Sequence, residues 1–141
     1  MKEILVDTCI WSLALRGKFP RDTTIANQLT ELIHIEKVKI IGPIRQEILS
    51  GYSDFKQYTT LKNKLKYFPN ISIIDNDYII AAEFSNLCRQ NGIQGSHIDF
   101  IICAVAHRLN MDIFTTDKDF IFYSKLLPIT LYSDINCGDQ F

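Results

Sequence analysis

The chain has 141 residues, of which 47% are apolar and 22% charged, and its formal net charge is −1 at pH 7. The length predicts a single domain over 1–141, with a loosely held tail at 133–141. The small net charge argues against a protein that coats nucleic acid without sequence preference, because such binding depends on neutralising phosphates. No apolar run approaches the ~18 residues of a membrane span, and the N-terminus does not resemble a signal peptide. We therefore expect a cytoplasmic globular protein with no membrane contact.

The four cysteines form no recognisable metal or disulfide pattern. No two of them are close enough in sequence for a zinc-type pair. Three lie inside apolar stretches, where a thiol behaves as a small hydrophobic group. In the expected cytoplasmic setting we predict that all four are reduced: Cys9, Cys88, Cys103 and Cys137.

Short apolar runs alternate with helical periodicity along the whole chain. Ile4 to Val6 is an uninterrupted apolar run, which is typical of a strand buried on both faces. The clearest helical stripe runs from Ile98 to Leu109. The predicted strands cover 4–6, 38–41, 71–74, 112–116 and 128–132. The predicted helices cover 8–16, 22–36, 44–49, 54–68, a stretch from 75–77 to 91–92, 96–109 and 119–126.

This alternation predicts an α/β protein with three layers, in which helices cover both faces of a mostly parallel sheet of four to five strands. Right-handed crossovers place the carboxyl ends of parallel strands at one edge of the sheet. If the chain reverses its direction across the sheet between the third and fourth strands, the first and fourth strands become neighbours. Their carboxyl ends then form the crevice in which such sheets bind ligands.

Four carboxylates are predicted at this edge of the sheet. Asp7 ends the first strand, and Asp117 follows the fourth. Asp99 lies in the first turn of the helix before the fourth strand, and Glu47 lies on the helix after the second. Carboxylates that gather without basic partners repel one another, and their pKa values rise unless a cation neutralises them. A hard divalent cation such as Mg²⁺ or Mn²⁺ suits an all-oxygen site, and such a site suits phosphodiester cleavage.

Each acid also has a purely structural interpretation, which the residues taken singly leave open. Asp7 would N-cap the first helix, and Asp99 would complete a capping box at the start of its own helix. Glu47 would be a solvated residue on a helix surface. Asp117 would be a turn residue, with Asp119 as the N-cap of the next helix. The expected convergence of four acids at one edge favours a functional site.

The four acids lie in four distinctive stretches, ILVDTCIW at 4–11, PIRQEILSG at 43–51, DFIICAVA at 99–106 and FTTDKDF at 114–120. In this order and with these separations, the stretches resemble the signature blocks of PIN-domain nucleases. The resemblance is specifically to VapC-like toxins of bacterial toxin–antitoxin pairs. It covers essentially the whole chain, although no single block is very specific.

The resemblance implies a Mg²⁺- or Mn²⁺-dependent endoribonuclease with Asp7, Glu47, Asp99 and Asp117 as its acidic site. Asp7 and Asp99 would be metal ligands, Asp117 would complete the site directly or through water, and Glu47 would hold a water or a second metal. Asp119 matches a further acid found in some members. The family also implies an RNA substrate, a cognate antitoxin that wraps the toxin and blocks its site, and commonly a homodimer.

Cys9 is a visible departure from the family pattern, because relatives often carry Ser at this position. A thiol is a much weaker hydrogen-bond partner than a hydroxyl. If the hydroxyl normally steadies the metal-bound acid or its water, we expect weaker or redox-sensitive activity here.

Several basic residues are candidates for contacts with RNA phosphates. Arg45 lies beside the second acidic stretch and Lys118 within the fourth. For each residue taken alone, an ordinary surface cation is an equally good interpretation. The lysines of the helix at 54–68 are expected to form only its solvated side. A further cluster of candidates follows the first helix: Arg16, Lys18 and Arg21.

Two other functions compete with a ribonuclease. A PIN-fold binding module that acts only through a protein partner is compatible with Cys9, although all four acids are present. A phosphatase with Asp7 as nucleophile usually needs a second acid two residues later, and that position is Cys9. The sequence therefore favours the ribonuclease.

Overall fold

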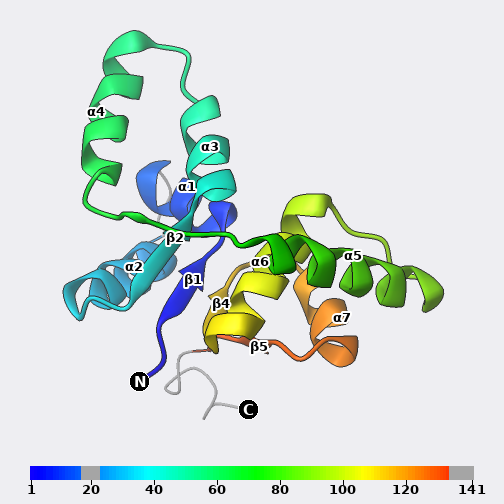
Figure 1. Cartoon of the computed structure of the whole chain (residues 1–141). Helices are drawn as coiled ribbons and strands as arrows, with labels where there is room; N and C mark the ends of the chain where they lie inside the picture. Colours follow the sequence, from blue (N-terminus) through cyan, green and yellow to red (C-terminus); the bar gives the residue numbers. More distant parts are fainter. Residues whose placement is uncertain (17–22, 134–141) are drawn as a thin grey trace.

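The centre of the molecule is a parallel sheet of five strands in the order β3-β2-β1-β4-β5 (Figure 1). The computed structural model describes residues 1–16 and 23–133, apart from the side chains of Arg16 and Thr23. The predicted tail beyond residue 133 lies outside the described residues, as do Lys18, Arg21 and Cys137. The strands are β1 (Ile4–Val6), β2 (Val38–Ile41), β3 (Asn70–Ile71), β4 (Asp112–Phe114) and β5 (Thr130–Leu131).

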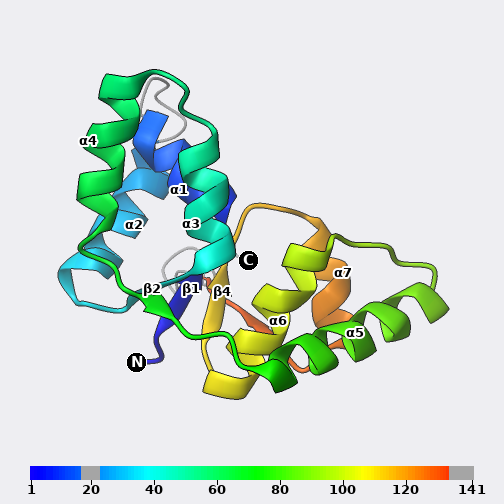
Figure 2. The same cartoon turned by 45° about the horizontal axis from the view of Figure 1, so that its top comes forward.

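Seven helices lie in the described ranges and flank the sheet on two sides (Figures 1 and 2). Helices α1 to α4 lie on one side and α5 to α7 on the other, which is the three-layer arrangement predicted from the sequence. None of these helices is long and apolar enough to cross a membrane. They are α1 (Thr8–Arg16), α2 (Thr23–His34), α3 (Gly42–Ser50), α4 (Phe55–Leu65), α5 (Asp75–Gln90), α6 (His97–Leu109) and α7 (Asp119–Leu126).

The first strand is at the centre of the sheet, between β2 and β4. The chain does reverse its direction after the third strand, because it passes from the edge strand β3 through α5 and α6 back to β4 beside β1. Val6 at the end of β1 is the register partner of Phe114 at the end of β4. The residues that leave these two strands therefore start side by side.

Helix α6 is buried more completely than its sequence pattern predicts. All seven residues from Phe100 to Ala106 are buried, where the pattern predicts a single apolar stripe. The reason is that α5 covers one side of α6 while the sheet covers another. Leu109, at the predicted end of the stripe, is 41% exposed because it lies beyond this covered part. Continuous burial holds α6 firmly, and with it the acid in its first turn.

Most other differences from the predicted elements are at their ends. Helix α3 begins at Gly42, two residues earlier than predicted, because Pro43 fits the first turn of a helix instead of closing the preceding strand. Helix α4 ends at Leu65 instead of 68, and β5 is shorter than predicted at both ends.

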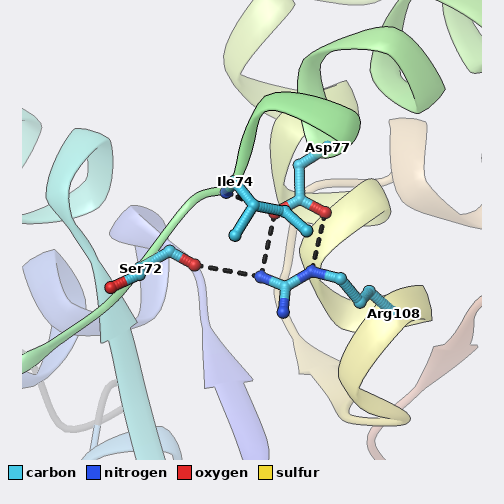
Figure 3. A network of polar contacts seen from close by, with 4 residues as sticks. All are labelled: Ser72, Ile74, Asp77 and Arg108. Atoms are coloured by element: carbon cyan, nitrogen blue, oxygen red, sulfur yellow. Dashed lines mark hydrogen bonds and ion pairs between the residues drawn. The ribbon is translucent and has the colours of Figure 1, made fainter.

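Strand β3 ends at Ile71 instead of 74, because the following residues belong to a polar network at the start of α5 (Figure 3). Asp77 is 1% exposed and accepts two hydrogen bonds from Arg108, Nε to Oδ1 at 2.8 Å and an Nη to Oδ2 at 2.9 Å. Arg108 also donates to the Ser72 carbonyl at 2.9 Å, and the Ile74 N–H donates to Asp77 at 3.0 Å. The network thus fixes the long crossover from β3 to the end of α6.

The network also sets the ionisation of Asp77. Burial alone raises the pKa of this carboxyl, but the hydrogen bonds from Arg108 and Ile74 and the charge of Arg108 outweigh burial. The native pKa therefore lies below the ordinary value of 3.8. A carboxylate with a lowered native pKa stabilises the fold above its unfolded pKa, and this stabilisation is lost as the pH falls through the native pKa.

Replacing Asp77 by Asn tests this network. We expect Asp77→Asn to lower the free energy of unfolding at pH 7 by about 2 kcal/mol, because a buried bond between charged groups is lost. The difference from the wild type should shrink as the pH falls below about 4. Urea unfolding at several pH values measures both quantities. Asp75→Asn, at an exposed acid in the same first turn, is the matched control and should change stability little. Equal losses in the two variants would contradict the assignment.

Candidate metal centre

Asp7 lies where β1 passes into α1, and its backbone extends the pairing with β4 by one residue. The Asp7 N–H donates to the Phe114 carbonyl at 2.9 Å. Its carboxylate is 8% exposed and accepts one hydrogen bond from the Thr8 N–H and one from the Thr115 hydroxyl, both at 2.8 Å. An N-cap side chain normally bonds to an N–H two or three residues ahead. The carboxylate is instead held partly by the neighbouring strand, which favours a site residue over a simple cap.

Asp99 lies in the first turn of α6, within a cluster of three carboxylates. Its N–H donates to the Ser96 hydroxyl at 3.1 Å, so Ser96 is the N-cap of the helix. The Asp99 carboxylate accepts a hydrogen bond from the Tyr123 hydroxyl of α7 at 2.7 Å. One oxygen from each of Asp99, Asp117 and Asp119 lies within 4.8 Å of the other two. This spacing is compatible with a shared cation.

Asp117 and Asp119 are brought to Asp99 by the turn between β4 and α7. The Asp117 N–H donates to the Thr115 hydroxyl at 3.0 Å, and the Asp119 N–H donates to Asp117 Oδ1 at 3.0 Å. The strand was predicted to run to 116, but it ends at Phe114 because Thr115 turns toward Asp7. Lys118, and not Asp119, is the N-cap residue of α7, so Asp119 is free of that structural role.

Glu47 is on α3, and the structure links it to the other acids through its charge. Its pKa is raised by partial burial and by the negative charges of Asp7 and Asp99, while a hydrogen-bonding contribution from Thr8 lowers it. The Thr8 hydroxyl is buried and makes no well-formed hydrogen bond with the described residues. Glu47 and Asp7 are outside the compact group of three acids, so the structure places the acids in two sets that influence each other electrostatically.

Asp99 lies among other negative charges. The pKa of Asp99 is raised by burial and by the charges of Asp7 and Asp117, although the hydroxyls of Tyr123 and Ser96 oppose this. Ion pairs in the described part of the chain involve other acids: Glu3, Asp77 and Asp112. This set of carboxylates, in which Asp99 and Glu47 have raised pKa values and no ion pair to a basic residue is present in the described part of the chain, fits a hard divalent cation.

Cys9 packs into the same hydrogen-bonded group as Asp7. Its Sγ lies 3.6 Å from Asp7 Oδ2 and 3.4 Å from the Thr115 hydroxyl oxygen, and it accepts from the Thr116 N–H at 3.4 Å. The thiol thus occupies a place where a hydroxyl would make the same contacts. Distances of this length are ordinary for the larger sulfur atom, and the acid itself is held by the Thr115 hydroxyl.

Two residues of the site were not predicted from the sequence. Thr115 directly follows a strand that is the neighbour of β1 and lies two residues before Asp117, so its position was an available signal. Tyr123 carries no such signal, because it is one of several apolar or aromatic residues in α7 and its contact with Asp99 depends on how two helices pack.

The predicted role of Arg45 in substrate binding does not agree with its contacts. Its guanidinium donates to Asn70 Oδ1 at 3.0 Å, to the Leu65 carbonyl at 2.8 Å and to the Phe68 carbonyl. These bonds tie α3 to the end of α4 and to β3, so we assign Arg45 a structural role. Lys118 is exposed beside the acidic cluster, where a phosphate contact stays a prediction.

The described cysteines agree with the predicted reduced state. Cys9, Cys88 and Cys103 are free thiols. Burial raises the pKa of the Cys103 thiol, and the negative charge of Asp99 adds to this effect. Cys103 is therefore a protonated core residue below the site.

Comparison with known proteins gives the family of the chain. The PIN domain family model matches residues 4–126. Ribonuclease VapC11 of Mycobacterium tuberculosis and VapC ribonuclease Mb1587 of Mycobacterium bovis are each 30% identical over 127 residues, which cover 87% of this chain and 92% of each relative. The chain therefore belongs to the PIN domain family, as the four sequence blocks predicted.

Solved structures share the fold. FitAcB from Neisseria gonorrhoeae matches with a TM-score of 0.75 and 20% identity, covering 92% of this chain and 96% of that chain. VapBC2 from Rickettsia felis, solved with a DNA fragment from its promoter, matches with a TM-score of 0.70 and 18% identity, again covering 92% and 96%. At these identities the structures support the fold alone.

The raised pKa of Asp99 predicts that its ionised carboxylate destabilises the fold when no cation is bound. The ionised form of Asp99 is disfavoured in the native state. The resulting loss in the free energy of unfolding is therefore absent below the unfolded pKa and complete above the native pKa. We expect Asp99→Asn in EDTA at pH 7 to raise the free energy of unfolding, whereas an average substitution lowers it by about 1 kcal/mol.

Urea unfolding between pH 4 and pH 7 measures this effect, and the advantage of Asp99→Asn should grow with pH. Glu83→Gln, at an exposed acid on α5, controls for the general loss of a negative charge. If Asp99→Asn is less stable than the wild type by the same amount at every pH, the clustered charges do not destabilise the fold.

Proposed function

We propose that this protein is a Mg²⁺- or Mn²⁺-dependent endoribonuclease that acts as the toxin of a toxin–antitoxin pair. The observation that carries the proposal is the convergence of acids at the carboxyl edge of β1 and β4 in a PIN-domain chain. The named relatives support it, because two proteins that are 30% identical over most of their length are called VapC ribonucleases.

We assign the acids distinct roles. Asp7 and Asp99 are the principal cation ligands, and Asp117 completes the set directly or through water, with Asp119 as an additional ligand. Glu47, on the opposite side, holds a water molecule or a second cation. A bound Mg²⁺ or Mn²⁺ supplies an activated water and stabilises the charge that develops on the leaving oxygen of a phosphodiester.

The chain's own residues prepare this site by fixing the acids before substrate arrives. The Thr115 hydroxyl holds one oxygen of Asp7, and the Tyr123 hydroxyl holds one oxygen of Asp99. Both donors are neutral, so they orient the carboxylates without cancelling their charge. The exposed Lys118 is positioned to contact a phosphate of the RNA backbone, which would set the register of the strand without reading its sequence.

The proposed biological setting follows from the VapC-like resemblance. A cognate antitoxin would wrap the toxin and cover the acidic site, the toxin would commonly form a homodimer, and both proteins would act in the cytoplasm. Growth arrest by the toxin expressed alone, and relief by the antitoxin, are the expected cellular effects.

Removal of a single acid tests the proposed chemistry. We expect the purified wild type to cut RNA with Mn²⁺ or Mg²⁺ and to lose this activity in EDTA. Asp7→Asn and Asp99→Asn should each lower the cleavage rate by about 100-fold or more, because a direct ligand matters more than the outer contacts whose loss typically costs 10–100-fold. Denaturing gel electrophoresis of end-labelled RNA measures the rate, and Asp75→Asn is the control outside the site.

Two outcomes would contradict the proposal. Cleavage that survives both Asp7→Asn and Asp99→Asn would exclude the acidic site as the source of activity. A wild type that neither cuts RNA nor binds Mn²⁺ in a calorimetric titration would favour the PIN-fold binding module instead.

Cys9 provides a second, finer test. The contacts of its thiol predict that Cys9→Ser keeps cleavage and raises it by no more than about fivefold, since one improved hydrogen bond contributes about 1 kcal/mol. Cys9→Ala, which removes the contacts, should lower cleavage by a similar factor. The same gel assay measures both variants. A gain of more than 100-fold in Cys9→Ser would mean that the thiol disables the wild-type site.

A further inference from the structure

Tyr123 is the largest fully buried side chain of the described core, and it ends in a polar group aimed at the acidic site. Its hydroxyl donates to Asp99 Oδ2 at 2.7 Å, a short distance that is typical of a bond to a charged acceptor. The residue comes from α7, and Asp99 comes from the first turn of α6. A single hydrogen bond therefore ties two helices together at the position where the carboxylates gather.

The ring of Tyr123 has little freedom to turn its hydroxyl elsewhere. It packs against Phe100 and Phe120, with both ring centroids 5.1 Å away and interplanar angles of 47° and 70°. Both partners are themselves buried, at 2% and 0% exposure. The direction of the hydroxyl is thus set by packing, independently of the carboxylate that accepts its hydrogen bond.

The loop between α5 and α6 closes tightly over the same hydroxyl. A Cβ atom added to Gly95 would lie 2.2 Å from the Tyr123 hydroxyl oxygen and 2.8 Å from Cζ. It would also lie 2.9 Å from Cζ of Phe100. These distances are too short for any side chain, so a glycine is required where the backbone passes over the tyrosine. The enclosure leaves the hydroxyl with Asp99 as its acceptor.

We propose that Tyr123 is a positioning residue for the cation site, whose buried hydroxyl holds the Asp99 carboxylate in the orientation needed to bind a divalent cation. The proposal rests on the proposed function, because it assumes that the acidic site binds such a cation. A donor on one carboxylate oxygen restricts the side-chain torsions and leaves lone pairs for a ligand. Partners of this kind around metal sites typically contribute 10–100-fold in metal affinity.

A purely structural role for Tyr123 would give a different result. If the ring only fills the core, removing its hydroxyl changes packing and stability but leaves the affinity for the cation unaltered. The measurement must therefore separate the dissociation constant of the cation from the stability of the fold.

Calorimetric titration of the full chain with Mn²⁺ provides this separation, with thermal unfolding of the metal-free protein as the second readout. We expect Tyr123→Phe to fold and to raise the dissociation constant of Mn²⁺ by 10–100-fold. Tyr78→Phe, which removes a hydroxyl from an exposed tyrosine on α5, should leave the dissociation constant unchanged. Leu32→Val, which loosens the buried core under α2 and leaves the aromatic cluster intact, should lower the unfolding temperature and leave Mn²⁺ binding within about threefold of wild type.

Gly95→Ala keeps the inference testable if Tyr123→Phe does not fold. It retains the tyrosine but forces the hydroxyl away from its place, so Mn²⁺ binding should weaken here as well. Wild-type affinity in Tyr123→Phe would overturn the inference while leaving the proposed function intact. Equal weakening in Leu32→Val and Tyr123→Phe would also overturn it, by assigning the effect to a general loss of stability. A wild type that does not bind Mn²⁺ would overturn the proposed function itself.

Discussion

The pairing of β1 with β4 is the constraint on which the rest of the site depends. The bond from the Asp7 N–H to the Phe114 carbonyl carries this pairing one residue past the strands. Thr115 is thereby placed beside Asp7, and its hydroxyl joins Asp7 to the backbone of Asp117. A slip of one residue between these strands would turn Asp7 toward the opposite face. The fully buried apolar residues of β1 prevent such a slip, so the hydrophobic core fixes the register of the acids.

The buried Asp77 and the half-buried Asp99 show how the chain gives the same residue type opposite properties. Asp77 is paired with Arg108, and its pKa is lowered despite burial. Asp99 has a neutral hydroxyl as its partner and further carboxylates nearby, and its pKa is raised. The first arrangement contributes stability at neutral pH, whereas the second leaves negative charge uncompensated. An uncompensated charge is unfavourable for folding but useful for binding a cation, so the difference in partners separates a structural acid from a functional one.

The acids were predictable from the sequence because each marks an abrupt local change. Asp7 ends an apolar run, and Asp117 follows one closely, so strand ends and candidate ligands were recognised together. Thr115 and Tyr123 were not predicted, because neutral hydroxyls are common and their contacts arise only when distant segments pack. The structural contacts of Arg45 were missed for a related reason. Its acceptors are carbonyls at the end of α4, and they become available only where that helix stops.

The distribution of the acids over the two helical layers links the site to the packing of the whole molecule. Asp7 follows β1 and Glu47 lies on α3, whereas the three clustered acids lie in the first turn of α6, in the turn after β4 and at the start of α7. Figure 2 shows α3 and α6 on opposite sides of the ends of β1 and β4. Burial and the charges of Asp7 and Asp99 raise the pKa of Glu47, so the acids repel one another without a cation. Burial of α6 from Phe100 to Ala106 opposes that repulsion. We expect a cation bound at these acids to oppose their repulsion, so that binding at the site and packing of the layers stabilise each other.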